Sequence, residues 1–341
     1  MRGDINEVKL NIKLLSTLAV AFLMSGCATH RLATRDSFVQ VLKTVDISAC
    51  GVDVENVGEE RCALFAQLSG VGSGAVVWNE RSIGGKPRTL VMTADHVCHD
   101  RSRNITQDMI PPEVLDEFRF SNGIEGDLEF NISSVDIKLR DSRGVEFDSN
   151  PNPWLRNVEA DICIIETSIN QRAVPVARHE PSYGDRVINI SAPYGLMFTN
   201  PEGGAVYITE GNYSGNLSMQ DGVRSMYTIW TAPGSSGSPI INEQGEIVGV
   251  VSAISMITWP RMNVQWIGVV SAPSNITFGP TLEQIQFSVD EAIAALKRGE
   301  PFVYDNTKGI GVTSGASTNQ GLDDSGIDSE QFLFPYIYEW K

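Results

Sequence analysis

The feature that most constrains this chain is a turn rich in glycine and serine, residues 231–241, with the sequence TAPGSSGSPII. Glycine adopts backbone angles that other residues resist, so such a turn can aim two neighbouring amide N–H groups, those of Gly234 and Ser236, at one point. Two N–H groups arranged in this way stabilise an oxyanion. The apolar run from Ile247 to Val251 follows. Clusters of Gly, Ser and Pro also occur as plain loops, so the turn by itself only suggests a nucleophilic serine.

Length and composition set the outer limits. The chain has 341 residues, 42% of them hydrophobic, which suits two globular domains or one large double domain. The net charge of -16 argues against nucleic acid as a partner, because phosphates would be repelled. The simplest explanation of the charge is solubility.

The first 26 residues have the pattern of a signal peptide. Arg2, Lys9 and Lys13 precede a short apolar stretch, residues 14–24. The stretch ends in Met-Ser-Gly-Cys, which resembles a bacterial lipobox, and this resemblance implies lipidation of Cys27. An ordinary signal peptide or an uncleaved anchor is the alternative. We therefore expect the bacterial cell envelope, with a lipid anchor at the outer membrane or its periplasmic side, or secretion.

Four cysteines remain after Cys27, an even number that permits two disulfides outside the cytoplasm. Cys50 and Cys62 are separated by a short polar loop, so we pair them first. Cys98 and Cys163 could form a second disulfide or remain buried thiols. The residues alone leave this choice open.

Short apolar runs separated by glycine turns dominate residues 62–280 and predict an all-β sandwich or barrel fold. We expect residues 27–61 to form a lead-in or spacer, residues 62–172 a first β-barrel and residues 173–280 a second. Pro111-Pro112, followed by residues 113–118, predicts a brief surface helix inserted into the first barrel.

The C-terminal part differs in character. Residues 281–300 have the apolar spacing of an amphipathic helix. Residues 301–341 predict a flexible tail, rich in Gly, Ser, Asn and Asp, with an aromatic end at residues 332–340. We expect that end to pack on the body as a final strand, and a tethered peptide that binds a partner or the cleft is the alternative.

A serine nucleophile needs a base, and histidine is the usual one. Of His30, His96, His99 and His179, only His96 follows an apolar strand, and the other three lie in polar segments. The base in turn needs an acceptor that fixes its tautomer. Asp161 stands at the entrance of an apolar strand, where a carboxylate without a partner would be costly.

Two other aspartates fit that role less well. Asp95 is adjacent to His96, and neighbouring side chains on a strand point apart. Asp185 lies in a Gly-Asp turn and is more simply explained as a turn residue.

Three motifs, Thr93-Ala94-Asp95-His96-Val97, residues 160–164 and residues 234–239, occur in the order His, Asp, Ser. This order resembles the chymotrypsin-fold serine proteases, most closely the bacterial trypsin-like branch that includes the HtrA/DegP proteins. Residues 72–77, 184–187, 192–196 and 245–249 are similar to the same branch. The resemblance covers about residues 62–272.

The resemblance implies two six-stranded antiparallel barrels with a cleft between them. It also implies a serine endopeptidase in which Ser236 attacks the scissile carbonyl, His96 transfers the proton and Asp161 holds His96. The N–H groups of Gly234 and Ser236 would form the oxyanion hole. Because His96 and Asp161 would then touch, Cys98 and Cys163 would be close enough for a disulfide.

The sequence departs from the family at several points. Ser235 occupies the place of an aspartate that pairs with a freed N-terminus in the digestive enzymes, so that activation is not expected. The specificity pocket would involve Trp230, Ser252 and Ala253, where no acid is seen. A small or apolar substrate side chain is therefore expected rather than Lys or Arg. The region after residue 275 is too short for a PDZ domain.

Two other functions are compatible with parts of the sequence. A protease-like binding protein of the cell envelope could keep the fold without turnover. An α/β-hydrolase would need the order Ser, acid, His, and no histidine follows Ser236. We expect protein or peptide substrates and neither a cofactor nor a metal.

Overall fold

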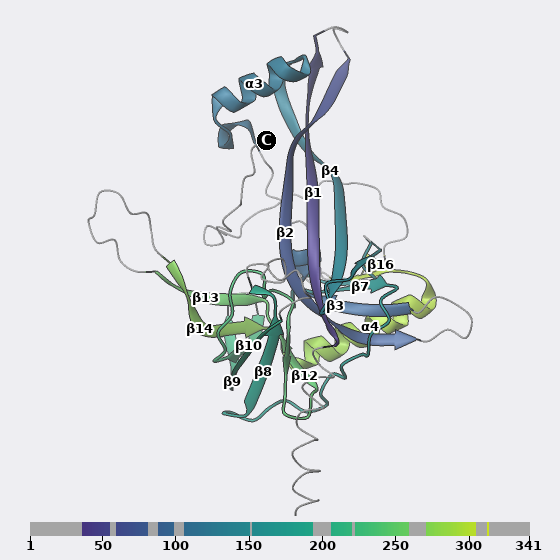
Figure 1. Ribbon diagram of the computed structural model, residues 1–341, viewed down its shortest axis with the longest axis vertical. Coiled ribbons are helices and arrows are strands. Elements are labelled where there is room, and N and C mark those ends of the chain that lie inside the picture. The colour runs from purple at the N-terminus through teal and green to yellow at the C-terminus, as the bar shows by residue number, and fades with distance from the viewer. Residues whose placement is uncertain are drawn as a thin grey trace, which may run out of the picture.

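The protein is described by a computed structural model that covers residues 36–54, 59–80, 88–98, 106–150, 152–193, 206–219, 222–258, 271–304 and 312–313. These residues form two β-sheets, a few short helices and one long C-terminal helix (Figure 1). The predicted all-β, two-barrel architecture with a C-terminal helix is confirmed.

The first sheet has the strand order β16-β15-β6-β7-β3-β2-β1-β4-β5. An isolated bridge between Ser149, just after β5, and Thr167 of β7 brings the two sides of this sheet together. Its strands are β1 (Phe38–Asp53), β2 (Glu60–Glu80), β3 (Arg88–Thr93), β4 (Ile124–Asp141), β5 (Glu146–Asp148), β6 (Leu155–Asn157), β7 (Ile162–Thr167), β15 (Phe302–Tyr304) and β16 (Val312–Thr313).

The second sheet has the order β12-β11-β8-β9-β10-β14-β13. A parallel bridge between Val176 and Ile247 attaches the linker between the two halves to β12. Its strands are β8 (Arg186–Ser191), β9 (Tyr207–Met219), β10 (Gly222–Tyr227), β11 (Pro239–Ile241), β12 (Ile247–Val250), β13 (Ala253–Thr258) and β14 (Ser271–Gly279).

The described residues thus supply nine and seven strands, where six in each barrel were expected. Part of the excess comes from beyond the C-terminal helix, because β15 pairs in parallel with β6 and carries β16 outside it. Parallel addition of a strand so distant in sequence leaves no local pattern to recognise.

The C-terminal helix α4 (Leu282–Arg298) joins the two halves. Thr281 caps it in a capping box with Gln284. Its apolar side, including Ile285 and Ala292, belongs to a core shared by β3 and β7 of the first sheet and β8 and β12 of the second. The two sheets and α4 are therefore held by one continuous hydrophobic core.

The predicted spacer, residues 27–61, contains a central strand of the first sheet. Strand β1 lies between β2 and β4, and Phe38, Val39 and Val41 are fully buried. The spacer assignment is wrong over residues 38–53. The pattern was hard to recognise because the second half of β1 extends beyond the barrel and is partly exposed to water.

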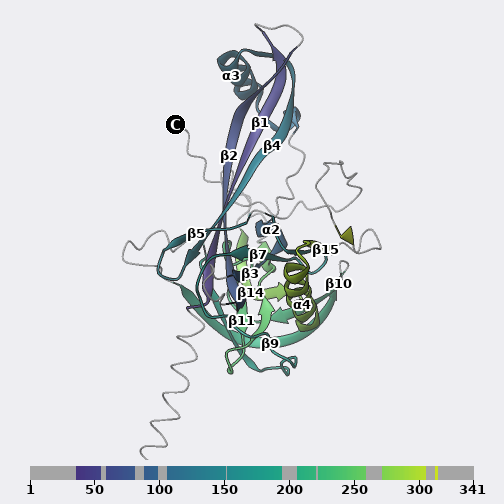
Figure 2. The ribbon, with the colours of Figure 1, turned by 90° about the vertical axis from the view of Figure 1, so that its right-hand side faces the viewer.

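That extension is the most unusual feature of the fold. Strands β1, β2 and β4 continue past the body as a three-stranded arm, which both views show projecting well beyond the sheets (Figures 1 and 2). The arm ends in η1 (Gln107–Met109) and α3 (Pro112–Asn122). The predicted inserted helix is confirmed as α3, with proline in its first turn and Gly123 in a left-handed conformation after its end.

The tip of the arm has its own small core. Ala49, Leu115, Ile124 and Leu128 are buried there together, and the ring of Phe65 packs edge-on against those of Phe118 and Phe130. The predicted disulfide between Cys50 and Cys62 crosslinks β1 and β2 at the same level. The tip is therefore built as a separate packed unit.

Several predictions fall outside the described residues: the signal peptide at residues 1–26, the lipidated Cys27 and the aromatic end at residues 332–340. Within the described ranges, no helix is long and apolar enough to cross a membrane.

We expect replacement of Cys50 and Cys62 by alanine to loosen the tip of the arm but not the body. The disulfide closes a short loop, and such crosslinks contribute about 2–3 kcal/mol. Hydrogen exchange of wild type and the double variant should show loss of amide protection in residues 45–66 and 112–130 alone. Equal loss of protection in β8, β11 and β12 would contradict the separation of the arm from the body.

Candidate active site

The first sheet brings His96 and Asp161 together. His96 lies on α2 (Asp95–Cys98), which begins two residues after β3, and Asp161 directly precedes β7. Strands β3 and β7 are antiparallel partners, with Thr93 opposite Cys163. The register therefore places the end of one strand and the start of the other at the same edge of the sheet.

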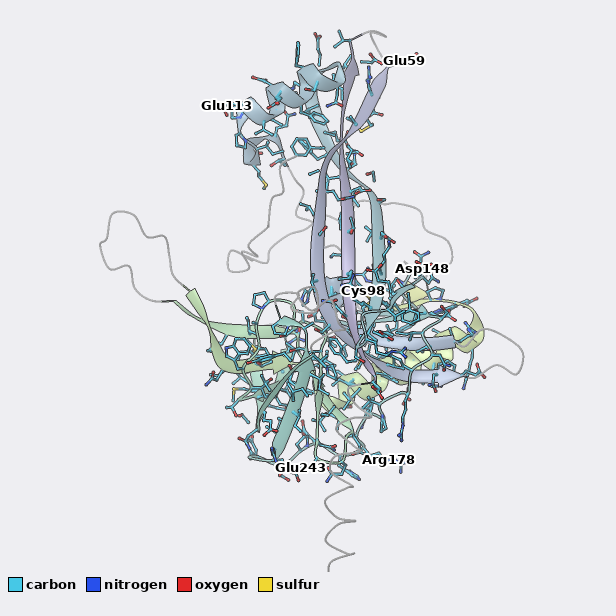
Figure 3. The ribbon with its side chains drawn as sticks, in the orientation of Figure 1. Glu59, Cys98, Glu113, Asp148, Arg178 and Glu243 are labelled. Atoms are coloured by element: carbon cyan, nitrogen blue, oxygen red, sulfur yellow. A yellow bond between two sulfur atoms is a disulfide. The ribbon has the colours of Figure 1, made fainter. Side chains whose placement is uncertain are left out.

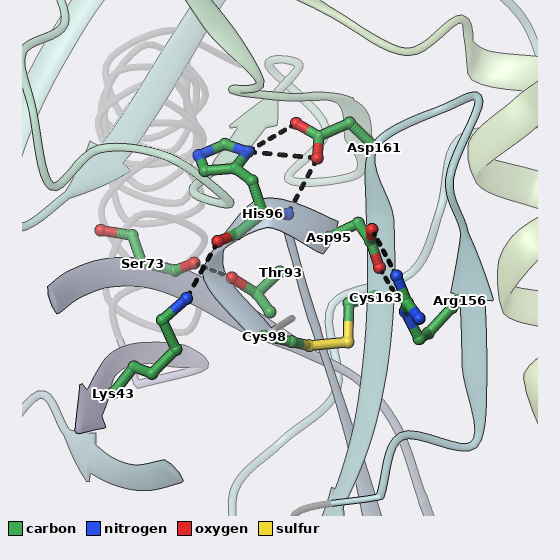
Figure 4. The surroundings of a disulfide bond; sticks show 9 residues. All are labelled: Lys43, Ser73, Thr93, Asp95, His96, Cys98, Arg156, Asp161 and Cys163. Carbon is green, nitrogen blue, oxygen red and sulfur yellow. Dashed lines mark hydrogen bonds and ion pairs between the residues drawn. A yellow bond between two sulfur atoms is a disulfide. The ribbon is translucent and has the colours of Figure 1, made fainter. Parts of the chain in front are cut away.

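The two side chains form a close pair (Figure 4). His96 Nδ1 lies 2.8 Å from one carboxylate oxygen of Asp161 and 3.1 Å from the other. The backbone N–H of His96 also donates to Asp161, at 3.0 Å. An imidazole whose Nδ1 proton is held by a carboxylate has its Nε2 free to accept another proton.

The carboxylate of Asp161 is largely withdrawn from water, with the residue 8% exposed. The hydroxyl of Ser252, from the second sheet, donates to it as well. Burial raises the pKa of Asp161, but the charge and hydrogen bonds of His96 and the Ser252 bond outweigh it, so the pKa lies below its ordinary value. The group is thus held as a carboxylate.

Asp161 is also the one non-glycine residue with positive φ among the described residues, at 55°. The turn with this left-handed conformation is stabilised by a buried hydrogen-bond chain. The buried side chain of Asn157 accepts a hydrogen bond from the Ala160 N–H at 3.0 Å and donates to Ser288 Oγ of α4 at 3.1 Å. Asn157 and Ser288 are therefore positioning residues that link the helix α4 to the turn of Asp161.

The loop that carries Ser236, residues 231–238, contains two successive turns. The Ser235 N–H donates to the Ala232 carbonyl at 2.9 Å, and Gly234 has φ of 93°. Proline in the second position and positive φ in the third are the signature of a type II turn. The middle peptide of this turn points opposite to that of a type I turn, so the turn type sets the direction of the Gly234 N–H.

Neither oxyanion-hole donor predicted from the sequence is engaged. In this fully described loop, the N–H groups of Gly234 and Ser236 donate no hydrogen bond. Gly234 is buried and Ser236 partly exposed. An unpaired backbone donor is rare at a buried residue such as Gly234, and two free donors in one short loop suit an anionic ligand.

The backbone around Ser236 is fastened to β2 and to the residues that precede His96. The Ser73 N–H donates to the Ser236 carbonyl at 2.8 Å. The next residue, Gly237, packs so tightly on Thr93 and Ala94 that an added Cβ would lie 2.2 Å from Thr93 Oγ1. The hydroxyl of Ser236 makes no hydrogen bond to His96 in the described structure. Such bonds often close only when substrate binds.

Ser235, which stands where the digestive enzymes carry an aspartate, is fully buried. Its hydroxyl accepts from the Ala232 N–H and donates to Ser191 Oγ, both at 3.3 Å. Ser235 is therefore held by neutral hydrogen bonds, at the place where the digestive enzymes hold an aspartate by an ion pair with the freed N-terminus.

The second disulfide lies directly behind the pair. Cys98 and Cys163 are crosslinked, and each is two residues from His96 or Asp161 (Figure 4). Both predicted disulfides are thus present, and the alternative of two buried thiols is wrong. The bond fastens α2 to β7, which are the elements that carry the pair.

The rival residues have other roles. The carboxylate of Asp95 turns away from His96 and pairs with Arg156 at 2.9 and 3.1 Å. Asp185 accepts from the Ser182 N–H within its turn. His179 is exposed, whereas His30 and His99 lie outside the described residues.

The three predicted pocket residues are spread along the second sheet. Trp230 is partly buried and packs edge-on against Tyr207. Ala253 begins β13, an edge strand, and Ser252 turns toward Asp161. Among the described residues, the group with metal-ligand spacing contains Cys50 and Cys62, whose sulfurs are consumed in their disulfide.

The fold and the loop geometry define a two-barrel protein with a paired imidazole and carboxylate, and with a partly exposed serine, Ser236, in a loop bonded to Ser73. A family model described as a trypsin-like peptidase domain matches residues 72–250, which include His96, Asp161 and Ser236. The match covers more than half of the chain, and the chain belongs to this family. No curated protein sequence matches it.

Solved structures similar to the chain include two bacterial proteases. The active form of the Rv3671c protease from M. tuberculosis is 13% identical, with a TM-score of 0.44, over 77% of this chain and 83% of that chain. The serine endoprotease from Yersinia pestis is 14% identical, with a TM-score of 0.44, over 79% of this chain and 66% of that chain.

We expect Asn157→Ala to disturb the Asp161 turn, because it leaves the buried Ala160 N–H and Ser288 hydroxyl without this partner. The cost should be about 1–3 kcal/mol of unfolding free energy. The downfield proton NMR signal of the His96 Nδ1–H should weaken or disappear. Ser288→Ala removes only the outer link and keeps the hydrogen bond from Ala160 to Asn157, so it should weaken the signal less than Asn157→Ala does. An unchanged signal in Asn157→Ala would contradict the positioning role.

The lowered pKa of Asp161 predicts a dependence of stability on acid. A carboxyl group whose folded-state pKa lies below its ordinary value of 3.8 stabilises the fold above that value. The stabilisation is lost as pH falls through the folded-state pKa. In urea denaturation, the difference in stability between wild type and Asp161→Asn should therefore shrink between about pH 5 and pH 2. A difference that stays constant would show that Asp161 gains nothing from its charge.

Proposed function

We propose that this protein is a serine endopeptidase that hydrolyses peptide bonds through His96, Asp161 and Ser236 and an acyl-enzyme intermediate. The observation that carries the proposal is the His96–Asp161 pair, held from both sheets and adjacent to a loop with two unengaged N–H groups. Membership of the trypsin-like peptidase family supports peptide or protein substrates.

The first step uses the tautomer that Asp161 selects. With its Nδ1 proton held by the carboxylate, His96 presents Nε2 as the base that takes the proton of Ser236 as Oγ attacks the carbonyl carbon. Asp161 keeps its negative charge and stabilises the imidazolium that forms. His96 then donates this proton to the leaving amine, and a water molecule repeats the sequence to release the acid.

The developing negative charge on the carbonyl oxygen needs donors that are already oriented. The type II turn at Gly234 and the backbone of Ser236 supply two such N–H groups in our proposal. Loss of one donor in this role costs about 10²–10³ in rate. Because Ser235 is fixed by neutral bonds, we propose that the loop reaches this conformation without a freed N-terminus.

The pocket residues favour uncharged substrate side chains. Trp230, Ser252 and Ala253 provide no carboxylate for Lys or Arg, and the ring of the partly buried Trp230 packs edge-on against the exposed ring of Tyr207. We therefore propose a preference for small or apolar residues before the cleaved bond.

The location follows from the cysteines. Two disulfides are typical of proteins outside the cytoplasm. We propose that residues 1–26 are removed, that Cys27 carries the lipid and that residues 28–35 connect it to β1 in the cell envelope.

The direct test is labelling with a fluorophosphonate probe, which reacts with an activated serine. We expect wild type to be labelled on Ser236, Ser236→Ala to be unlabelled, and His96→Ala to be labelled at least a thousandfold more slowly. Casein cleavage should follow the same order. Ser133→Ala, at an exposed serine of β4 outside the loop, is the control and should be labelled as wild type is. A properly folded wild type that neither reacts with the probe nor cleaves casein would be the inactive, protease-like alternative.

A further inference from the structure

The outer face of α3, at the tip of the arm, has no partner within the described structure. Glu113, Asp116, Glu117 and Phe120 follow the spacing i, i+3, i+4 and i+7, so they share one face of this helix. The opposite side carries Leu115 and Phe118 into the core of the tip. Figure 3 shows Glu113 at the outer end of the arm, far from the body.

This face combines free charge with an exposed aromatic ring. Phe120 is 91% exposed, the largest value among the exposed large hydrophobic residues described. Glu113 and Glu117 are exposed and form neither an ion pair nor a hydrogen bond, while Asp116 pairs with Arg119 at 3.2 Å. An isolated phenyl ring beside unpaired carboxylates contributes nothing to the packing of the tip.

The charge of the tip restricts what can bind there. Residues 49–67 and 106–131 contain eleven acidic and two basic residues, which is -9 of the net charge of -16. Such a surface repels nucleic acid, anionic lipid and a second copy of itself. It attracts a cationic segment of a protein, and a Lys or Arg side chain can also lie over the ring of Phe120.

The arm connects this face to the candidate active site. Lys43, on β1 at the base of the arm, donates to the carbonyl of His96 at 3.3 Å (Figure 4). From Lys43 to Cys50 at the tip the strand rises about 3.3 Å per residue, or about 23 Å in all. The disulfide and the small core hold the tip at that distance.

We propose that the outer face of α3 docks a cationic segment of a protein that also offers an apolar side chain. Resting on the proposed protease function, this segment belongs to the protein substrate and binds at the far end of the arm, beyond the roughly 23 Å of strand that separates Cys50 from the contact between Lys43 and His96. The arm is then an exosite, so the substrate class is proteins with a basic region remote from an uncharged cleavage site.

Binding is tested first, without turnover, on full-length Ser236→Ala protein. The probe is a fluorescent peptide of Lys-Lys-Leu repeats, with a Glu-Glu-Leu peptide as its counterpart. Only the cationic peptide should bind. In the Ser236→Ala protein, Glu113→Gln with Glu117→Gln should raise the Kd of the cationic peptide about fivefold at low salt, and Phe120→Ser should raise that Kd further.

A matched control removes two charges elsewhere. Glu283 and Asp290 are exposed, unpaired acids on α4, and Glu283→Gln with Asp290→Asn leaves the tip unchanged. This double variant should bind the probe as Ser236→Ala does. Equal loss of binding in both doubles would show a net-charge effect and overturn the docking face, as would absence of binding. Binding of anionic vesicles instead would assign the face to a membrane and also overturn it.

Kinetics then test the exosite. In otherwise wild-type protein, Glu113→Gln with Glu117→Gln should raise KM for histone, an unfolded basic substrate, about fivefold without changing kcat. KM for casein and the rate of fluorophosphonate labelling should stay as in wild type. An unchanged KM for histone would overturn the exosite. A wild-type protein that never reacts with the fluorophosphonate would instead contradict the proposed protease function. Binding of the fluorescent peptide to α3 would still test the docking face in that case.

Discussion

The arrangement of the site depends on the buried carboxylate of Asp161 and on its hydrogen-bond donors. Asp161 accepts from the ring and the backbone of His96 on α2, next to the first sheet, and from Ser252 in the loop between β12 and β13 of the second. An isolated charge at such a site would cost several kcal/mol, so the sheets, the turn and the hydroxyl must be in place together. The same bonds that stabilise the carboxylate orient the imidazole. The geometry of the site is thus a consequence of how the chain accommodates one charge.

Several long-range features keep this arrangement rigid. The Cys98–Cys163 disulfide fastens the elements carrying His96 and Asp161, and α4 reaches the Asp161 turn through Ser288 and Asn157. The shared core packs α4 against both sheets, so neither half can shift without disturbing the other. On the opposite side, β1 connects the back of His96 to the arm through Lys43. The site is therefore supported from the C-terminal helix and from the arm.

The motifs around His96, Asp161 and Ser236 could be recognised from the sequence because their chemistry demands particular residue types in short, glycine-marked segments. The Cys50–Cys62 disulfide and the two helices α3 and α4 were predicted for similarly local reasons. The Cys98–Cys163 disulfide, which spans 65 residues, was implied only by the family resemblance, because that resemblance brings His96 and Asp161 together. The roles of Asn157 and Ser288 could not be predicted, since their contact spans 131 residues and each is unremarkable in its own segment. Strand β1 was assigned to a spacer because its apolar spacing did not decide between strand and helix. Strand β15 was missed because it pairs in parallel with a strand far away in sequence.

The decisive measurement is a crystal structure of the protein after reaction with a fluorophosphonate. We expect phosphorus bonded to Ser236 Oγ, with a phosphoryl oxygen accepting from the N–H groups of Gly234 and Ser236 at about 2.7–3.1 Å. His96 Nε2 should lie within hydrogen-bond distance of the adduct while Nδ1 stays on Asp161. A phosphoryl oxygen that points away from both N–H groups, or an adduct on another residue, would contradict the proposed mechanism.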